Sequence, residues 1–305
     1  MLAIIISEQV KNEPEDKYLS SGHSIVWENM GKIYNYGKFH FVNKIDIYEL
    51  PDENQKQSNE EYPQGLCMTQ DYVFVSLYSD GRGKLGKIKV FDKKSGKLLL
   101  ILGMDENSHL GGLAFDGEAI WACNPSKMAL ERISYSLIQK LIQEKQGKMI
   151  DVRNLVEVYR VKNVPSCVTY NDGMLWVATH SIWSNSTMIA YKYEEEKNKL
   201  EVQDNFRIPP KVQGVAFSER GEVYLSISYG RRNSSFIKKY KSLHTMSNDV
   251  RAYAMLIELP PCSEEIVYEN GRLYVLFESA GKKFLTGMDG KGKSLFPIDR
   301  IIWIQ

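Results

Sequence analysis

The sequence lacks an excess of charge of either sign, because 39 Lys and Arg residues are matched by 38 Asp and Glu residues and leave a formal net charge of +1 at pH 7. Without a field of one sign, the chain does not attract nucleic acid or an anionic membrane over long range. Long hydrophobic runs are missing too. The opening segment, MLAIIIS, is too short for a membrane span or for the apolar part of a signal peptide. We therefore expect no nucleic-acid partner and no membrane span, and we interpret residues 1–20 as an edge strand and a linker.

Cysteine is scarce as well, with four residues in 305, and they stand at wide, uneven separations with no CxxC pair. This spacing argues against a zinc site or haem attachment. The four cysteines lie in apolar segments, which predicts buried free thiols, and one disulfide between neighbouring repeats is the alternative. They are Cys67, Cys123, Cys167 and Cys262.

Contiguous enzyme motifs are also absent: there is no GxSxG, no Walker loop, no GxGxxG after a strand and no HExxH. A catalytic group assembled from distant segments would leave no such motif. The absence therefore lowers the prospect of an enzyme without removing it.

What the sequence does contain is a repeat. Residues 108–124, SHLGGLAFDGEAIWACN, read as a glycine-led start, a short apolar strand, a turn and a second strand. The same pattern recurs along the chain with an aromatic residue near the start of each second strand, at Phe74, Trp121, Trp176, Tyr224 and Tyr274. These positions are separated by 47, 55, 48 and 50 residues. Spacings of roughly 40 to 50 residues are typical of β-propeller blades.

A further hairpin sets the expected number of blades. Residues 26–34, VWENMGKIY, echo residues 267–274, VYENGRLY, with one insertion, and residues 38–42 and 45–50 could be the outer strands of a compressed first blade. The sequence thus predicts an all-β protein, a β-propeller of six four-stranded blades in one domain over residues 1–305, with blades from residue 21. Five blades plus an N-terminal extension is the alternative.

Two insertions and one loop interrupt the blades. A short amphipathic helix is expected between Ile133 and Val156, inside one blade, and a weaker insertion at residues 242–250. The polar segment from Asn54 to Glu61 is expected to be a loop.

The repeat also predicts where a ligand would bind. In a propeller, the loop before each innermost strand and the loop after each second strand emerge on one face, around the channel mouth. The first kind of loop brings His23, Gln64, His109, Gln213 and Glu264, and the second kind brings Tyr78, Asn124, His180, Tyr229 and Glu278. Among these polar residues, His109, His180 and Glu264 are the candidates for catalysis. The alternative is a mouth whose polar residues simply meet water.

Two details qualify this face. Glu264 and Glu265 are adjacent, so one should face the channel and the other a blade interface, where it needs a donor such as Arg272. Cationic residues just beyond the second strands could bind an anionic ligand: Arg82, Lys84, Lys127, Arg231, Arg232, Lys282 and Lys283.

Three blade segments resemble the YncE-like, NHL-like and streptogramin-lyase-like bacterial propellers: GGLAFDGEAIWAC (111–123), CVTYNDGMLWVAT (167–179) and GVAFSERGEVYLSIS (214–228). The resemblance covers most of residues 61–277 and implies a propeller with a site at the channel mouth, but it is a packing pattern. Six-bladed relatives of the gluconolactonase type hold a divalent metal there through Glu, Asn and Asp. By this resemblance Glu264 and Asn124 would supply two metal ligands, although no Asp stands at the remaining mouth positions.

We therefore expect a non-catalytic binding or scaffold propeller, monomeric and without a cofactor, that presents its mouth to a small polar or anionic ligand or to a partner protein. The alternative is a metal-assisted, lactonase-like hydrolase or lyase at the same mouth. The sequence as given predicts a cytoplasmic protein, or an extracellular one if an export signal has been removed.

Overall fold

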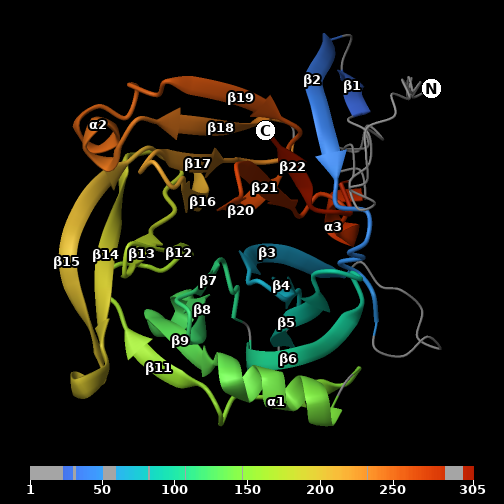
Figure 1. Ribbon diagram of the computed structural model, residues 1–305. Coiled ribbons are helices and arrows are strands. Elements are labelled where there is room, and N and C mark those ends of the chain that lie inside the picture. Colours follow the sequence, from blue (N-terminus) through green and yellow to red (C-terminus); the bar gives the residue numbers. More distant parts are fainter. Residues whose placement is uncertain are drawn as a thin grey trace.

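The protein is a β-propeller of five blades (Figure 1). The computed structural model describes residues 23–29, 32–50, 60–81, 83–106, 108–145, 147–231, 233–285 and 298–305.

Blade 1 contains β3 (Glu61–Met68), β4 (Tyr72–Ser79), β5 (Leu85–Asp92) and β6 (Leu98–Glu106), from the innermost strand outward. Blade 2 contains β7 (Leu113–Phe115), β8 (Ala119–Asn124), β9 (Ala129–Ser134) and β11 (Glu157–Arg160). Blade 3 contains β12 (Cys167–Asn171), β13 (Met174–Ala178), β14 (Ser186–Glu194) and β15 (Lys199–Ile208). Blade 4 contains β16 (Val212–Phe217), β17 (Val223–Ile227), β18 (Ser235–Tyr240) and β19 (Met255–Leu259).

The fifth blade is built from both ends of the described chain. Its order from the inside is β20 (Ser263–Glu269), β21 (Arg272–Phe277), β22 (Ile302–Ile304), β2 (Lys32–Phe41) and β1 (His23–Asn29). His40 pairs with Trp303 and Phe41 with Ile302, so the N-terminal hairpin closes the ring on the C-terminal strand.

The prediction of six blades is therefore wrong. The hairpin at residues 26–34 does form, as β1 and β2, but it has no inner strands of its own and is added to the outside of blade 5. Residues 45–50 form no strand, and their apolar side chains Ile45, Ile47 and Tyr48 pack with Leu66 and Leu276 instead. The predicted edge strand in residues 1–7 lies outside the described residues.

The recurring aromatic residue is confirmed as the second-strand position of every blade. Phe74 packs with Leu113 and Ile120 of blade 2, and Trp121 packs with Val168 and Leu175 of blade 3. Trp176, Tyr224 and Tyr274 contact the following blade in the same way. The aromatic side chain recurs because each blade must fill the apolar gap to its neighbour.

The predicted helical insertion is α1 (Tyr135–Lys145), between β9 and β11. Its buried residues Ile138, Leu141 and Ile142 join the core between blades 1 and 2. The chain then adds β10 (Met149–Asp151) parallel to β6 of blade 1, so the insertion ties two blades together. The weaker insertion forms α2 (Leu243–Asn248), and a last short helix is α3 (Lys282–Leu285). None of the described helices has the length and apolar character needed to cross a membrane.

All four cysteines are free and buried, as the sequence predicts, and burial raises the pKa of each thiol.

The inner strands approach one another closely because four of the five blades have a small residue at one aligned position. That position holds Gly65, Gly112, Cys167, Gly214 and Glu265 in blades 1 to 5. A Cβ on Gly112 would lie 2.7 Å from both the Cα of Cys167 and Oε2 of Glu265, and one on Gly214 would lie 2.8 Å from Oε1 of Glu265. The glycines thus make room for the carboxyl group of Glu265, which lies between blades 2, 4 and 5.

Glu265 is 1% exposed, and burial raises the pKa of its carboxyl group well above the usual range. Oε1 accepts hydrogen bonds from the backbone N–H groups of Val215 (3.3 Å) and Ile266 (3.4 Å). Backbone amides therefore supply the donors that the sequence led us to expect from Arg272, whose guanidinium lies over the ring of Trp303, 4.7 Å from its centroid.

Candidate functional site

Three of the five innermost strands are irregular at the same height. The pairing register shifts between Pro63 and Leu66 in β3, between Val212 and Gly214 in β16, and between Ser263 and Ile266 in β20. A bulge bends its strand and redirects the side chains it contains. The residues inside these bulges include Gln64, Gln213 and Glu264, which the repeat had placed before the innermost strands.

The centre of the site is a pair of carboxyl groups. Glu264, 3% exposed, forms a hydrogen bond with half-buried Glu278, and Gln64 donates from Nε2 to Oε2 of Glu278 at 2.9 Å. Burial, followed by repulsion from Glu278, raises the pKa of Glu264 well above its usual range. Burial also raises the pKa of Glu278, although Lys283 acts in the opposite direction. Both shifts favour retention of a proton by the pair.

A cation and two aromatic rings lie next to this pair. Nζ of Lys283, in α3, contacts the Tyr78 hydroxyl and lies 4.0 Å from the ring centroid of Tyr62 and 5.0 Å from that of Phe284. The Arg231 guanidinium donates to the carbonyl oxygen of Lys283 at 2.9 Å. This hydrogen bond ties α3, which contains Lys283, to the loop between β17 and β18.

The ring of His109 stacks on Tyr78, with centroids 4.2 Å apart. The His109 side chain keeps access to solvent, but the protein atoms around the ring remove part of its hydration and, with Lys283 nearby, lower the pKa of His109 to about 4. The imidazole is therefore neutral at pH 7 and can both donate and accept a hydrogen bond. We use the name mouth cluster for Gln64, Tyr78, His109, Glu264, Glu278 and Lys283.

Five sequence-predicted residues are outside the mouth cluster, although His180 lies close enough to His109 to oppose its protonation. His23 begins β1, the outermost strand of blade 5, so its predicted place before an innermost strand is wrong. Gln213 lies half-buried in the β16 bulge. Nδ1 of His180 is 3.1 Å from the carbonyl oxygen of Val212. The ammonium group of Lys211 lies over the ring of Tyr229, with Nζ 4.7 Å from the ring centroid.

Asn124 does not meet Glu264. Its side-chain amide donates to Glu131 (2.8 Å) and Asp105 (3.3 Å), and its oxygen accepts from Ser126 (2.6 Å). Because the amide is engaged by blades 1 and 2, these residues do not fit the metal site that the gluconolactonase resemblance implies. Within the described ranges, no group of three or more His, Cys, Asp or Glu side chains could hold a metal ion.

Three of the seven expected anion-binding cations form ion pairs with acids: Lys127, Lys282 and Lys283, the last with Asp80 at 4.0 Å. Lys127 pairs with Asp105 (3.3 Å) and Glu131 (3.1 Å), and Lys282 pairs with Glu60 (2.6 Å). Arg82 and Arg232 lie outside the described residues. Of this set, Lys283 is the cation that reaches the carboxyl pair electrostatically, with Arg231 behind it.

Sequence reasoning missed Tyr62 and Phe284, which enclose Lys283. Tyr62 precedes Gln64 by two residues on β3. Residues two apart on a strand point to the same face, so the predicted position of Gln64 could have indicated Tyr62 as well. No such pattern indicated Phe284, because α3 has no counterpart in the other blades.

No protein-family model matches the chain, and no curated protein matches it. Among solved structures, a glutaminyl cyclase from Myxococcus xanthus is similar at 13% identity and a TM-score of 0.46, over 72% of this chain and 88% of that one. Hydrazine synthase from Kuenenia stuttgartiensis is similar at 12% identity and a TM-score of 0.41, over 75% of this chain and 58% of that one. A chain of a nidogen/laminin complex is similar at 9% identity and a TM-score of 0.41, over 85% and 83%. Likeness at this level concerns overall shape alone, so the propeller assignment stands on the five sheets and no narrower family is shown.

Proposed function

We propose that the protein binds a small polar ligand at the mouth cluster. The observation that carries this proposal is the Glu264–Glu278 pair. Two carboxyl groups in contact, one of them almost fully buried, cost stability because burial and mutual repulsion both oppose ionisation. Buried ionisable groups with strongly shifted pKa values are typical of functional sites.

The chemistry of the cluster suggests what the ligand carries. The carboxyl pair and the neutral imidazole of His109 accept hydrogen bonds, while Lys283, Tyr78 and Gln64 donate them. A ligand with an amine, amide or hydroxyl group toward the carboxyl pair, and a carbonyl or carboxylate toward Lys283, would match both sides. A ligand displaces water from this cluster at little cost only if each donor and acceptor of the cluster regains a hydrogen-bond partner on the ligand.

Glu264→Gln is expected to stabilise the protein at pH 8 and to change it little at pH 5. The folded-state pKa values of Glu264 and Glu278 are raised above their usual 4.5. The stability that this bound proton contributes is complete below pH 4.5 and is lost as pH rises through the folded-state values. Because Gln cannot ionise, the unfolding free energy of Glu264→Gln should fall less steeply with rising pH than that of the parent. The two slopes should differ by up to about 1.4 kcal/mol per pH unit. Urea denaturation at a series of pH values measures this slope.

The comparison is clearest above pH 6.5. The lowered pKa of His109 has the opposite effect, since stability is lost as pH falls from 6.5 toward 4. Glu118→Gln, in an exposed turn, is the matched control and should leave the slope of the parent protein unchanged. Parallel curves for the parent and Glu264→Gln between pH 6.5 and 8.5 would contradict the raised pKa.

Ligand binding itself is tested by melting temperature in a panel of amino acids, amides, amines and sugars. A ligand at about 100 times its Kd adds about 2.7 kcal/mol to stability. Glu264→Gln and Lys283→Gln should each weaken binding at least tenfold. Lys282→Gln is the matched control, since that lysine adjoins Lys283 in α3 but pairs with Glu60. Shifts that are equal in the parent and in Glu264→Gln would contradict the proposal.

The same assay tests the metal-assisted alternative. Calcium, magnesium, manganese and zinc salts are added to the parent protein and to Glu264→Gln. A metal-induced rise in melting temperature that Glu264→Gln abolishes would favour a hydrolase or lyase over a binding protein.

A partner protein is a second candidate occupant of this face, favoured by the 84% exposure of Trp183. Trp183 lies between β13 and β14, close to His180 in sequence, and its ring centroid is 6.3 Å from that of Tyr229. Exposed tryptophans commonly anchor protein interfaces. In the ligand assay above, Trp183→Ala should leave small-molecule binding unchanged, which separates the two occupants.

A further inference from the structure

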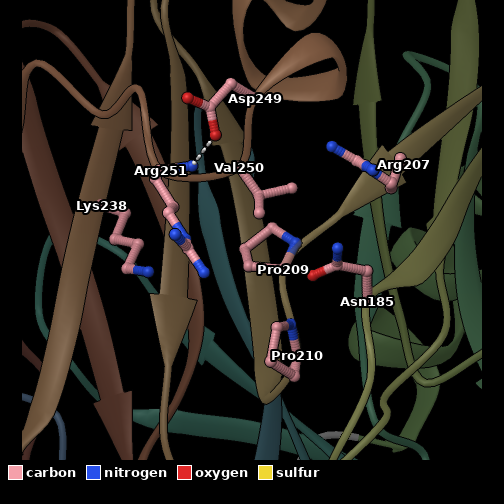
Figure 2. Close-up of a pocket in the computed structure, with 8 residues that line it drawn as sticks. All are labelled: Asn185, Arg207, Pro209, Pro210, Lys238, Asp249, Val250 and Arg251. Carbon is pink, nitrogen blue, oxygen red and sulfur yellow. Dashed lines mark hydrogen bonds between the residues drawn. The ribbon is translucent and has the colours of Figure 1, made fainter.

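A hollow that is lined by no residue of the mouth cluster lies where blades 3 and 4 meet. It is a groove of about 530 Å³ lined by Asn185, Arg207, Pro209, Pro210, Lys238, Asp249, Val250 and Arg251 (Figure 2). Arg207 comes from β15 and Lys238 from β18, while Arg251 follows α2. Pro209 and Pro210 form the link between β15 and β16. We call it the blade 3–4 groove.

The groove is positively charged. It contains three cationic side chains and one carboxylate, which leaves two positive charges in a chain whose formal net charge is only +1. In Figure 2 the side chains of Arg251 and Arg207 lie on opposite sides of Pro209, with Lys238 beside Arg251. The carboxylate of Asp249 accepts the backbone N–H of Arg251 at 2.9 Å, so it is partly engaged already.

The cations have few partners within the protein. Nη2 of Arg207 donates to the carbonyl oxygen of Asn248 at 3.1 Å, which fixes the guanidinium against the groove wall. Lys238 is half-buried and lies 5.0 Å from the ring centroid of Tyr253, and burial lowers its pKa. Among the described residues, no acid forms an ion pair with either Lys238 or Arg251. Cationic side chains gathered around one groove can bind phosphate and carboxylate groups through charge-assisted hydrogen bonds.

Lys238 lines two neighbouring hollows, which together form a longer depression. The second hollow has a volume of about 510 Å³ and is also lined by Lys211, Tyr229 and Tyr253. Loss of its charge should therefore affect an anion in either part of the depression.

We propose that the blade 3–4 groove binds a small anion carrying two or more negative charges on phosphate or carboxylate groups. The two guanidinium groups supply bidentate hydrogen bonds and Lys238 supplies a point charge. The proposal does not depend on the mouth cluster, whose cation, Lys283, belongs to α3.

The test is isothermal titration of the full chain at pH 7 and low salt with two probes, pyrophosphate and citrate. Saturable binding is expected for at least one, weakened at least tenfold by Lys238→Gln and by Arg251→Gln. Binding should also weaken as sodium chloride is raised, since salt screens exposed charges. Pyrophosphate alone would identify a phosphate ligand, citrate alone a carboxylate ligand, and binding of both a general polyanion site.

Two variants serve as controls. Arg220→Gln removes an exposed cation from the turn between β16 and β17, and Lys283→Gln removes the mouth cation. Both should leave the affinity unchanged. Arg251 is exposed, so its replacement should not disturb folding even if that of Lys238 does. The proposal fails if neither probe saturates, if Arg220→Gln weakens binding as much as Arg251→Gln, or if Lys283→Gln abolishes it.

Discussion

Replacing Gly112 with alanine is expected to lower the free energy of unfolding by about 3 kcal/mol, or to prevent folding altogether. The added Cβ would lie 2.6 Å from the backbone nitrogen of Val168 and 2.7 Å from the Cα of Cys167. Both are main-chain atoms of the neighbouring inner strand, so the clash is relieved only if blades 2 and 3 separate. Urea denaturation of the purified protein measures the loss.

Gly271→Ala is the matched control for this prediction. Gly271 lies in the turn between β20 and β21 with a φ of +76°, and nothing lies within 4 Å of its added Cβ. Its replacement should cost about 1–2 kcal/mol, from the left-handed backbone alone. If Gly112→Ala costs no more than Gly271→Ala, then blades 2 and 3 are not packed as closely as these distances require.

The repeat could be predicted from the sequence because its cause is local and recurs five times. Each aromatic residue on a second strand fills the gap to the next blade, so Trp121 and Trp176 mark the same place in two different sheets. The alignment of the blades also contains the inner-strand position held by Gly65, Gly112, Cys167, Gly214 and Glu265. The role of this position depends on how closely the inner strands approach one another. That distance is set by the number of blades, which the sequence analysis had wrong.

The number of blades could not be predicted because a hairpin reads alike on the inside and the outside of a sheet. Residues 26–34 carry the same alternation and turn as residues 267–274. What distinguishes them is the pairing of His40 with Trp303, a contact between opposite ends of the chain. Local patterns contain no information about such closure.

The mouth cluster was predicted in part for a similar reason. The blade repeat fixes where each loop emerges, so Gln64, Glu264 and Glu278 fall within reach of one another. It does not fix which way a side chain turns. Asn124 is the last residue of β8, whereas Glu278 follows the end of β21, and Asp105 and Glu131 hold the Asn124 amide in the interface of blades 1 and 2.

Residues 45–50 were predicted to form a strand and do not, yet they pack into the core. Their apolar side chains join the core of blades 5 and 1, but their carbonyl groups have no sheet to pair with. Nζ of Lys89 donates to the carbonyl oxygens of Ile47 and Glu49, both at 2.9 Å. A lysine on the third strand of a blade thus replaces the hydrogen bonds that an adjoining strand would have made.

Lys89→Met is accordingly expected to lower the free energy of unfolding by about 3–5 kcal/mol. Lys89 is 0% exposed, and its ammonium lies 3.3 Å from Oε2 of Glu61, the residue expected in a polar loop but found buried at the start of β3. Methionine fills the volume but leaves two carbonyl groups and a buried carboxylate without this donor. Urea denaturation gives the global loss, and hydrogen exchange should show faster opening at residues 45–50 than in the strands of blade 3.

Lys87 provides the control, because it pairs with the same carboxylate from a position where its side chain is 24% exposed. Lys87→Met should cost no more than about 1 kcal/mol, as partly exposed pairs do. Glu61→Gln combined with Lys89→Met should recover part of the loss, because Lys89→Met alone leaves the buried carboxylate with one of its two lysines. If the two losses simply add, the ammonium is not neutralising Glu61, and its contribution lies in the carbonyl groups of residues 47 and 49 alone.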